Sequence, residues 1–152
     1  MANIIGTNGN DTLMGSDSAD TMNGLAGNDT IIPNGNDTLT GGGGKDKFFV
    51  YDYNYYGNYG TAIITDFDGI GKGVNPSAGV IAEVDTLSFQ GPAFTAQNLL
   101  LTQNGNNLEI TFEGQYAGYA GTKIILQNFA LENLDNLSKS TGATVDLGNI
   151  EP

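Results

Sequence analysis

The chain has 152 residues, enough for one compact unit or for two small ones that share a core. It carries 17 acidic residues against 5 lysines, and the net charge of -12 argues against nucleic acids and anionic membranes as partners, because both attract basic surfaces. Histidine and cysteine are absent, which excludes Ser-His-Asp and Cys-His catalysis, disulfide bonds and zinc sites built from these residues.

A nine-residue unit repeats from residue 6 to residue 49. Each copy has a glycine-rich turn that closes on an aspartate, and the five turns, numbered in chain order, end at Asp11, Asp20, Asp29, Asp37 and Asp46. An apolar residue follows two positions after each aspartate, at Leu13, Met22, Ile31, Leu39 and Phe48, and Ile4 continues this series one step earlier. A Gly/Asn-rich linker would not place apolar residues so regularly, so a repeat architecture is favoured.

One unit has a simple physical interpretation. Its glycines permit tight turns and expose carbonyl oxygens, and the short strand after the aspartate sends one side chain inward. Two units make one coil, so turns 1, 3 and 5 stack along one edge and turns 2 and 4 along the other. This stacking brings Asp29 near both Asp11 and Asp46, and it brings Asp20 near Asp37. Clustered carboxylates repel unless a cation lies between them, and carboxylate and carbonyl oxygens suit calcium.

The repeat resembles the calcium-binding nonapeptide G-G-x-G-x-D-x-U-x of the repeats-in-toxin (RTX) family. The fifth copy, which begins Gly41-Gly42-Gly43-Gly44-Lys45-Asp46, matches every fixed position. The resemblance implies an all-β fold, a right-handed parallel β-roll that holds calcium between turns n and n+2. It also implies that the repeat aspartates and backbone oxygens of the turns are the ligands. The implied turn residues are Gly6, Asn8, Gly9, Gly24, Ala26, Gly27, Gly35, Gly42 and Gly44.

The copies differ in quality. The first and third keep the first and fourth glycines and the aspartate, whereas the second has Ser18 at a glycine position and the fourth is one residue short and begins at Pro33. We therefore expect about three calcium sites, two good ones on the edge of turns 1, 3 and 5 and a weaker one on the other edge.

Residues 51–152 are expected to form a β-rich cap that shares its core with a calcium-binding roll over residues 1–50. A roll needs such a cap because its last rung would otherwise expose apolar surface and unpaired backbone. Strands are expected at 62–67, 84–89, 99–103, 108–112 and 122–126, with a hairpin turn at Asn104-Gly105-Asn106 and a loop over 69–79. A short helix and a final strand are equally compatible with the spacing of Leu131, Leu134 and Leu137. In total, we expect five to seven strands packed on the roll.

Two segments of the cap have a functional alternative. Residues 51–59 hold five of the seven tyrosines, which suggests either a carbohydrate-binding platform or a surface loop; the loop is favoured because no tryptophan accompanies them. Asp66-Phe67 and Asp85-Thr86-Leu87-Ser88 resemble the segment that follows the repeats in secreted RTX metalloproteases. Asp66, Asp68 and Asp85 are therefore candidates for further calcium ligands, although ordinary solvated turn acids are the favoured interpretation.

The sequence predicts a non-catalytic, secreted calcium-binding protein whose folding is switched on by extracellular calcium. A carboxylate pair for glycoside hydrolysis is disfavoured because the best-placed acids are committed to calcium. The alternative is the C-terminal folding and type I secretion module of a larger exoprotein of the toxin, protease or lipase class.

The predicted location is outside the cell or on its surface. No cleavable N-terminal signal peptide is seen, and no run of about 18 apolar residues could span a membrane. The RTX resemblance implies export through a type I channel by an uncleaved C-terminal signal, with which Val145–Pro152 is compatible.

Overall fold

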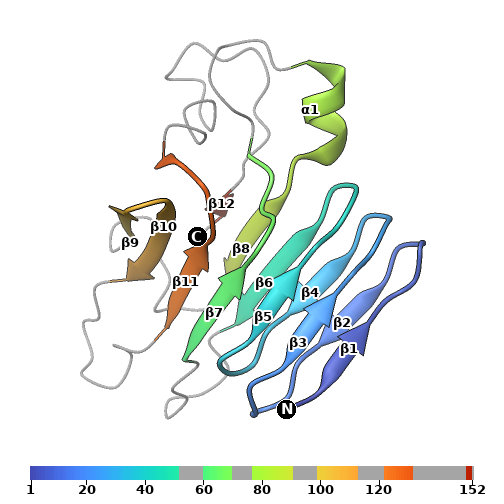
Figure 1. The fold of residues 1–152 in the computed structure, drawn as a ribbon, viewed down its shortest axis with the longest axis horizontal. Coiled ribbons are helices and arrows are strands. Elements are labelled where there is room, and N and C mark those ends of the chain that lie inside the picture. Colours follow the sequence, from blue (N-terminus) through green and yellow to red (C-terminus); the bar gives the residue numbers. More distant parts are fainter. Residues whose placement is uncertain (52–59, 70–76, 91–98, 113–121, 132–149, 152) are drawn as a thin grey trace.

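The computed structural model describes residues 1–51, 60–69, 77–90, 99–112, 122–131 and 150–151. These residues form two β-sheets that enclose one apolar core (Figure 1). The larger sheet has seven strands in the order β1 (Asn3–Ile5), β3 (Thr21–Asn23), β5 (Thr38–Thr40), β7 (Thr61–Ile64), β11 (Lys123–Leu126), β10 (Asn107–Phe112) and β9 (Leu99–Asn104). The smaller sheet has five strands in the order β12 (Ile150–Glu151), β8 (Thr86–Gln90), β6 (Lys47–Tyr51), β4 (Thr30–Ile32) and β2 (Thr12–Met14).

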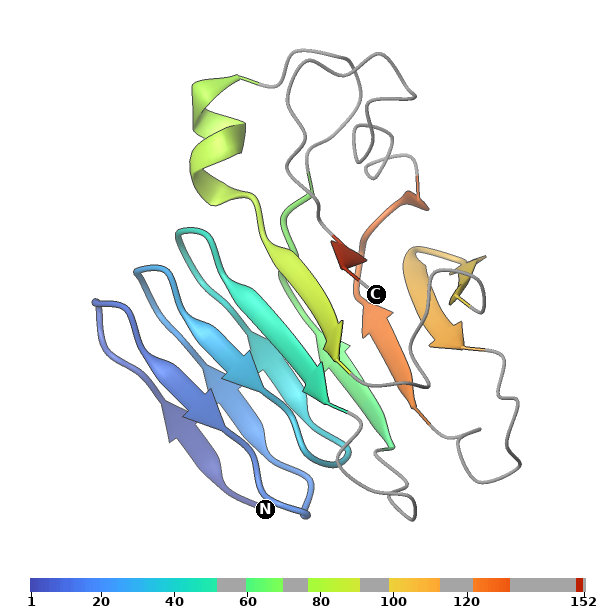
Figure 2. The same cartoon turned by 180° about the vertical axis from the view of Figure 1, so that it is seen from behind.

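The repeat region is a parallel β-roll, as predicted. Strands β1, β3 and β5 lie in one sheet and β2, β4 and β6 in the other, so the chain changes sheet at every glycine turn (Figure 2). All four pairings are parallel and shift by one coil: Ile4 lies beside Met22, and Leu13 lies beside Ile31. Each turn therefore stacks on the turn two units away, which confirms the two edges inferred from the repeat.

The three-residue length of the strands follows from the nine-residue unit. In β2 to β5 the middle residue is buried between the sheets, and its two neighbours are more exposed. One inward side chain per strand builds a column through the roll, because alternate residues of a strand face opposite sides. The column contains Leu13, Met22, Ile31, Leu39 and Phe48.

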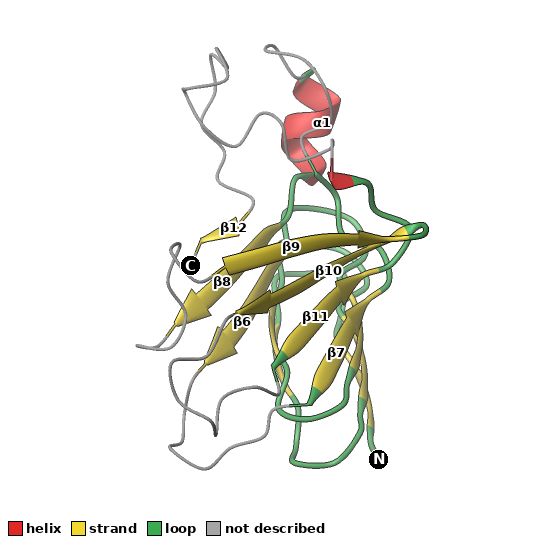
Figure 3. Cartoon of the chain, turned by 90° about the vertical axis from the view of Figure 1, so that its left-hand side faces the viewer, coloured by secondary structure: helices red, strands yellow, loops and turns green. Residues whose placement is uncertain are grey.

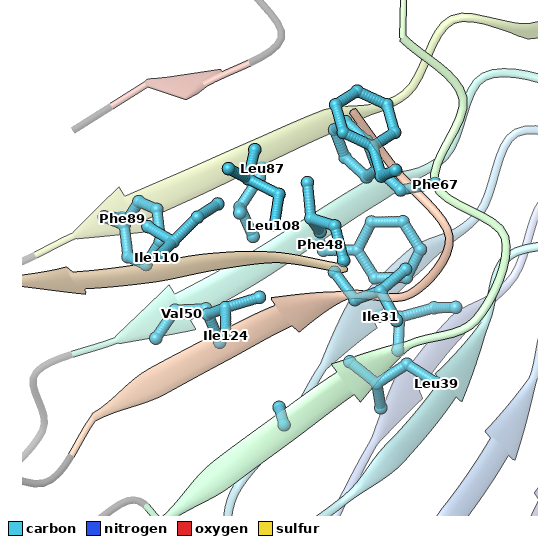
Figure 4. Packing of buried hydrophobic residues seen from close by; sticks show 14 of the residues in the cluster. Ile31, Leu39, Phe48, Val50, Phe67, Leu87, Phe89, Leu108, Ile110 and Ile124 are labelled. Carbon is cyan, nitrogen blue, oxygen red and sulfur yellow. The ribbon is translucent and has the colours of Figure 1, made fainter. Parts of the chain in front are cut away.

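Parallel rungs continue after residue 50. Strand β7 pairs with β5, and β8 pairs with β6 so that Leu87 lies beside Phe48. The Phe48 and Phe67 rings lie 6.0 Å apart, and one apolar cluster joins residues from both sides of residue 50 (Figure 4). The division into a roll over 1–50 and a cap over 51–152 stays a prediction.

The strands expected near 84–89, 99–103, 108–112 and 122–126 are confirmed as β8, β9, β10 and β11, within two residues at each end. Strands β9 and β10 form the antiparallel hairpin predicted around Gly105, which has a φ of +60°. Strand β11 lies between β10 and β7, antiparallel to one and parallel to the other (Figure 3). Strand β7 ends at Ile64 instead of residue 67. The chain turns there because the Asp66 carboxylate accepts hydrogen bonds from the Gly41 and Gly42 N–H groups.

Two short elements were not expected, strand β12 and a helix that begins after Ser77. The predicted loop over 69–79 is wrong at its end, where helix α1 (Ala78–Glu83) begins. The Ser77 hydroxyl accepts a hydrogen bond from the Val80 N–H at 3.3 Å and caps this helix. A serine cap was visible in the sequence, but Gly79 and the six-residue length concealed the helix.

Some sequence predictions lie outside the described residues. They concern the tyrosines of 52–59, with the carbohydrate alternative that depends on them, as well as Leu134, Leu137 and most of 145–152. Within the described part of the chain, no helix is long and apolar enough to cross a membrane.

Candidate metal centre

The five repeat aspartates form two columns, one on each edge of the roll. Backbone amides link the members of each column: the Asp11 N–H donates to Asp29 Oδ1 at 2.8 Å, and the Asp29 N–H donates to Asp46 Oδ1 at 2.9 Å. On the other edge the Asp20 N–H donates to Asp37 Oδ1 at 2.8 Å. The neighbours inferred from the spacing are therefore the neighbours in the fold, while the role of these aspartates as ligands stays a prediction.

Glycine permits the close stacking of the turns that carry these aspartates. Gly27 and Gly42 have φ values of +109° and +100°, in the region that favours glycine. A Cβ on Gly27 would lie 2.7 Å from the Gly9 carbonyl oxygen, so a side chain would force the turns apart. Turns 3 and 5 are bonded directly, with the Gly43 N–H donating to the Leu25 carbonyl at 3.0 Å.

Carboxylate and carbonyl oxygens meet beside the first glycine of a turn. A Cβ on Gly6 would lie 2.8 Å from Asp11 Oδ2 and 2.7 Å from the Gly24 carbonyl oxygen. One coil further on, a Cβ on Gly24 would overlap Asp29 Oδ2 and lie 2.5 Å from the Gly41 carbonyl oxygen. The missing side chain thus leaves a cradle lined by oxygens from two adjacent turns, a donor set that suits calcium.

The repeat carboxylates differ in how their outer oxygens are satisfied, and Asp11 Oδ2 accepts from both the backbone and the hydroxyl of Thr7. Asp29 and Asp46 are 1% and 2% exposed, and the Oδ2 atom of each is buried without a hydrogen-bond partner in the described residues. On the other edge, Asp20 Oδ2 accepts from both the backbone and the hydroxyl of Ser16, and Asp37 Oδ2 accepts from the Asn34 N–H. A buried charged oxygen without a partner costs more than about 1–3 kcal/mol. A cation would remove this cost on the edge of turns 3 and 5.

The pKa values of these carboxyls vary with burial and with hydrogen bonding. Burial raises the pKa of Asp46 to about 6, and the nearby Asp29 carboxylate adds to the effect. Burial also raises the pKa of Asp29 and of Asp37. In contrast, the hydrogen bonds from Ser16 hold the pKa of Asp20 below its usual value. The ionised forms of Asp29 and Asp46 therefore lack compensation that Asp20 has.

Asp85 corrects the sequence analysis. It is not a solvated turn acid, because it is 2% exposed and its carboxylate accepts from the Asp46 N–H at 2.9 Å and the Asp68 N–H at 2.8 Å. Asp85 is thus the next member of the Asp11–Asp29–Asp46 column, and burial raises its pKa to about 8. The triplet Asp85-Thr86-Leu87 has the same sequence as Asp11-Thr12-Leu13 in the first repeat. This similarity is the sequence signal that could have identified Asp85 as a member of the column.

The other predicted ligands lie in the glycine turns along the two edges. Those in turns 1, 3 and 5 are Gly6, Asn8, Gly9, Gly24, Ala26, Gly27, Gly42 and Gly44, and the one in turn 4 is Gly35. No group of three or more acidic side chains within the described residues converges closely enough to hold a metal ion. A site in this roll would therefore have to include backbone oxygens.

A parallel roll whose turns bring buried carboxylates beside backbone carbonyl oxygens defines a calcium-binding repeat protein. Residues 3–32 and 34–50 match the family model of the RTX calcium-binding nonapeptide repeat in four copies, with the gap at Pro33. This segment is an array of RTX repeats, and the protein contains a calcium-binding module. The match covers less than a third of the chain. A comparison with curated proteins found no match.

Proposed function

We propose that the protein is a non-catalytic calcium-binding module that folds when it meets extracellular calcium. The observation that supports this most directly concerns the Oδ2 atoms of Asp29 and Asp46, each of which is buried without a hydrogen-bond partner among the described residues. These carboxylates belong to one column, so they repel each other in an environment that water does not screen. Calcium between the turns would neutralise them and satisfy both oxygens.

The proposed strong sites lie on the edge of turns 1, 3 and 5. Asp29 takes part in two of them, one with Asp11 and the Gly24 carbonyl oxygen, and one with Asp46 and the Gly41 carbonyl oxygen. A weaker third site lies between Asp20 and Asp37. It is weaker because turn 2 has Ser18 at a glycine position and turn 4 is one residue short.

Calcium binding is coupled to folding in this proposal. The paired oxygens come from turns that are 17 or 18 residues apart in the sequence, so the sites exist only when the coils are stacked. The free energy of calcium binding then contributes directly to folding. At extracellular calcium of about 10⁻⁴ to 10⁻³ M such sites fill, whereas cytosolic calcium leaves them empty.

The test is circular dichroism and thermal unfolding of the full chain with chelator, with millimolar calcium and with millimolar magnesium. Chelator should abolish the β-type spectrum and calcium should restore it. Calcium at 100 times its dissociation constant should add about 2.7 kcal/mol per site. Magnesium should substitute poorly because it requires octahedral geometry and retains its water. Identical spectra and melting temperatures in chelator and calcium would refute the proposal.

A second candidate function is the C-terminal folding and export module of a larger exoprotein. RTX repeats are typical of type I secreted exoproteins, and Asp66-Phe67 and Asp85–Ser88 resemble the post-repeat segment of the secreted metalloproteases. A reporter enzyme fused before this chain should reach the medium through a type I channel. A matched fusion that lacks residues 145–152 should stay inside the cell. Retention of both fusions would refute export without affecting calcium binding.

A further inference from the structure

We propose that Asn23 is a modification site whose reactivity depends on folding. Its side-chain amide is lost by deamidation while the roll is unfolded, and the folded roll protects it. The role of calcium in this protection rests on the proposed function, in which calcium folds the roll.

An asparagine that is followed by glycine is chemically reactive, because glycine has no Cβ to shield its backbone nitrogen. That nitrogen attacks the Cγ atom of the asparagine side chain. The Cγ–Nδ2 bond breaks, the amide leaves with the N–H proton as ammonia, and a succinimide ring forms. Water then opens the ring at either carbonyl. One opening gives aspartate, and the other gives isoaspartate, in which the main chain runs through the side chain and is longer by a CH₂ group.

The chain contains four Asn-Gly pairs, at residues 8–9, 23–24, 34–35 and 104–105. Of their glycines, Gly9 and Gly105 are exposed and Gly35 is half-buried, whereas Gly24 is buried. An unfolded chain exposes all four pairs to the same reaction. The fold therefore distinguishes the pair at Asn23 from the others.

Three contacts hold Asn23 and Gly24 in an unreactive geometry. The Gly24 N–H donates to the Thr40 carbonyl oxygen at 3.0 Å, so the next coil occupies the attacking nitrogen. The Asn23 Oδ1 atom accepts from the Leu25 N–H at 3.1 Å, which fixes the side-chain amide. A Cβ on Gly24 would lie 2.5 Å from the Gly41 carbonyl oxygen, so the backbone at Gly24 has no room to rotate toward the side chain.

The pair at Asn8 lacks this protection from a neighbouring coil. Asn8 and Gly9 are both exposed, and the Gly9 N–H donates to the Thr7 hydroxyl of its own turn at 3.1 Å. Such a local bond opens without any change in the stacking of the coils. Asn8 is therefore an internal reference for the reaction in the folded chain.

Isoaspartate at position 23 should prevent the roll from folding again. Asn23 is the last residue of β3 and pairs with Ile5 of β1 on one side and with Thr40 of β5 on the other. An additional CH₂ group in the main chain here displaces Gly24 from Thr40 and shifts the turn that leads to Asp29. Time spent unfolded without calcium thus becomes irreversible damage to the central coil of the roll.

The test is peptide mapping by mass spectrometry after the full chain has been aged at mildly alkaline pH. Three samples are compared: one in millimolar calcium, one in chelator, and one in chelator with urea. Mass spectrometry detects the replacement of NH₂ by OH, and fragmentation of the peptide distinguishes isoaspartate from aspartate. Asn23 should be modified at least about tenfold more slowly in calcium than in urea, because the reaction requires the coil to open. Asn8 should be modified in all three samples.

Refolding of the aged chains tests the consequence. Each sample is returned to calcium, and molecules that fail to fold are separated by gel filtration; they should be enriched in isoaspartate at position 23. Asn23→Thr removes the reactive amide and introduces the residue that the next coil has at the paired position, Thr40. After ageing in urea this variant should refold to a greater extent than the wild type. Asn104→Thr is the matched control, because it removes the same amide from the hairpin pair, and it should lose refolding as the wild type does.

The outcomes separate this proposal from the proposed function. Equal rates at Asn23 in urea and in calcium, for a chain that circular dichroism shows to be folded in calcium, would overturn it. An aged Asn23→Thr chain that loses refolding as the wild type does would also overturn it. Full protection of Asn23 in chelator would instead refute the role of calcium in folding and leave protection by the fold intact. If fresh Asn23→Thr does not fold, the modification rates of the wild type decide.

Discussion

Asp46→Asn is expected to have opposite effects with and without calcium. In the calcium-free fold at pH 7, Asp46 is a buried carboxylate whose pKa is raised from 3.8 to about 6. A pKa difference of one corresponds to about 1.4 kcal/mol, so keeping this group ionised costs the calcium-free fold about 3 kcal/mol. Asparagine keeps an oxygen for the Asp29 N–H and carries no charge. The substitution should therefore raise the free energy of unfolding without calcium, by up to about 3 kcal/mol.

With calcium the same substitution should be destabilising. Asp46 is a proposed ligand on the strong edge, and the loss of one carboxylate should lower the apparent calcium affinity at least tenfold, or about 1.4 kcal/mol. The stabilisation that calcium gives to the wild type should thus be much smaller in the variant. Measurements with and without calcium therefore distinguish a calcium ligand, whose loss destabilises only the calcium-bound protein, from a carboxylate with a structural role alone.

Asp20→Asn is the matched control from the other edge. Its carboxylate accepts hydrogen bonds from Ser16 and from the Ala2 N–H, and these bonds lower its pKa. Its ionised form therefore stabilises the calcium-free fold, and the substitution should lower the free energy of unfolding in chelator.

Urea unfolding followed by circular dichroism measures both variants in chelator and in millimolar calcium. Trimethylamine N-oxide is added to all samples to populate the calcium-free fold. If Asp46→Asn destabilises the chelated protein as Asp20→Asn does, the charge on Asp46 is not uncompensated and the reasoning is wrong.

Three further predictions concern the carboxylate columns and the apolar rung that follows the repeats. In chelator with trimethylamine N-oxide, the stability of the calcium-free fold should fall as the pH rises from about 4 to about 8. The raised pKa values of Asp46 (about 6) and Asp85 (about 8) let the folded chain hold more protons than the unfolded one over this range. Melting temperatures that stay constant over this range would contradict it. Asp29→Ala should weaken calcium binding more than Asp20→Ala, because Asp29 serves two proposed sites; equal losses in titration calorimetry would show that the edge assignment is wrong. A fragment of residues 1–50 keeps all five repeat aspartates but loses Phe67 and Leu87, which pack on Phe48 or pair beside it. It should show no calcium-induced circular dichroism change, and folding with the affinity of the full chain would show that the segment after residue 50 is an independent domain.

The sequence by itself determined the roll and its two edges. Its repeating unit contains a glycine turn, an aspartate and a three-residue strand with one inward side chain. Each of these features is local, so the position of Leu13 or Asp29 in the coil can be inferred from its own neighbours in the chain. The hairpin at Gly105 was predictable for the same reason, since its turn is encoded by adjacent residues.

Only the tertiary structure decided that the column of carboxylates continues beyond Asp46. Asp85 lies 39 residues after Asp46, and Glu83 lies 39 residues after Gly44, so no local pattern relates them. Asp85 resembled a turn acid because burial depends on which segments cover a side chain, and those segments are remote in the sequence. The structure also decided which carboxylate oxygens lack a hydrogen-bond partner. Asp20 and Asp29 have the same place in the repeat, but Ser16 of turn 2 donates to Asp20 Oδ2. In contrast, Asp29 Oδ2 is buried without a hydrogen-bond partner in the part of the chain that the structure describes.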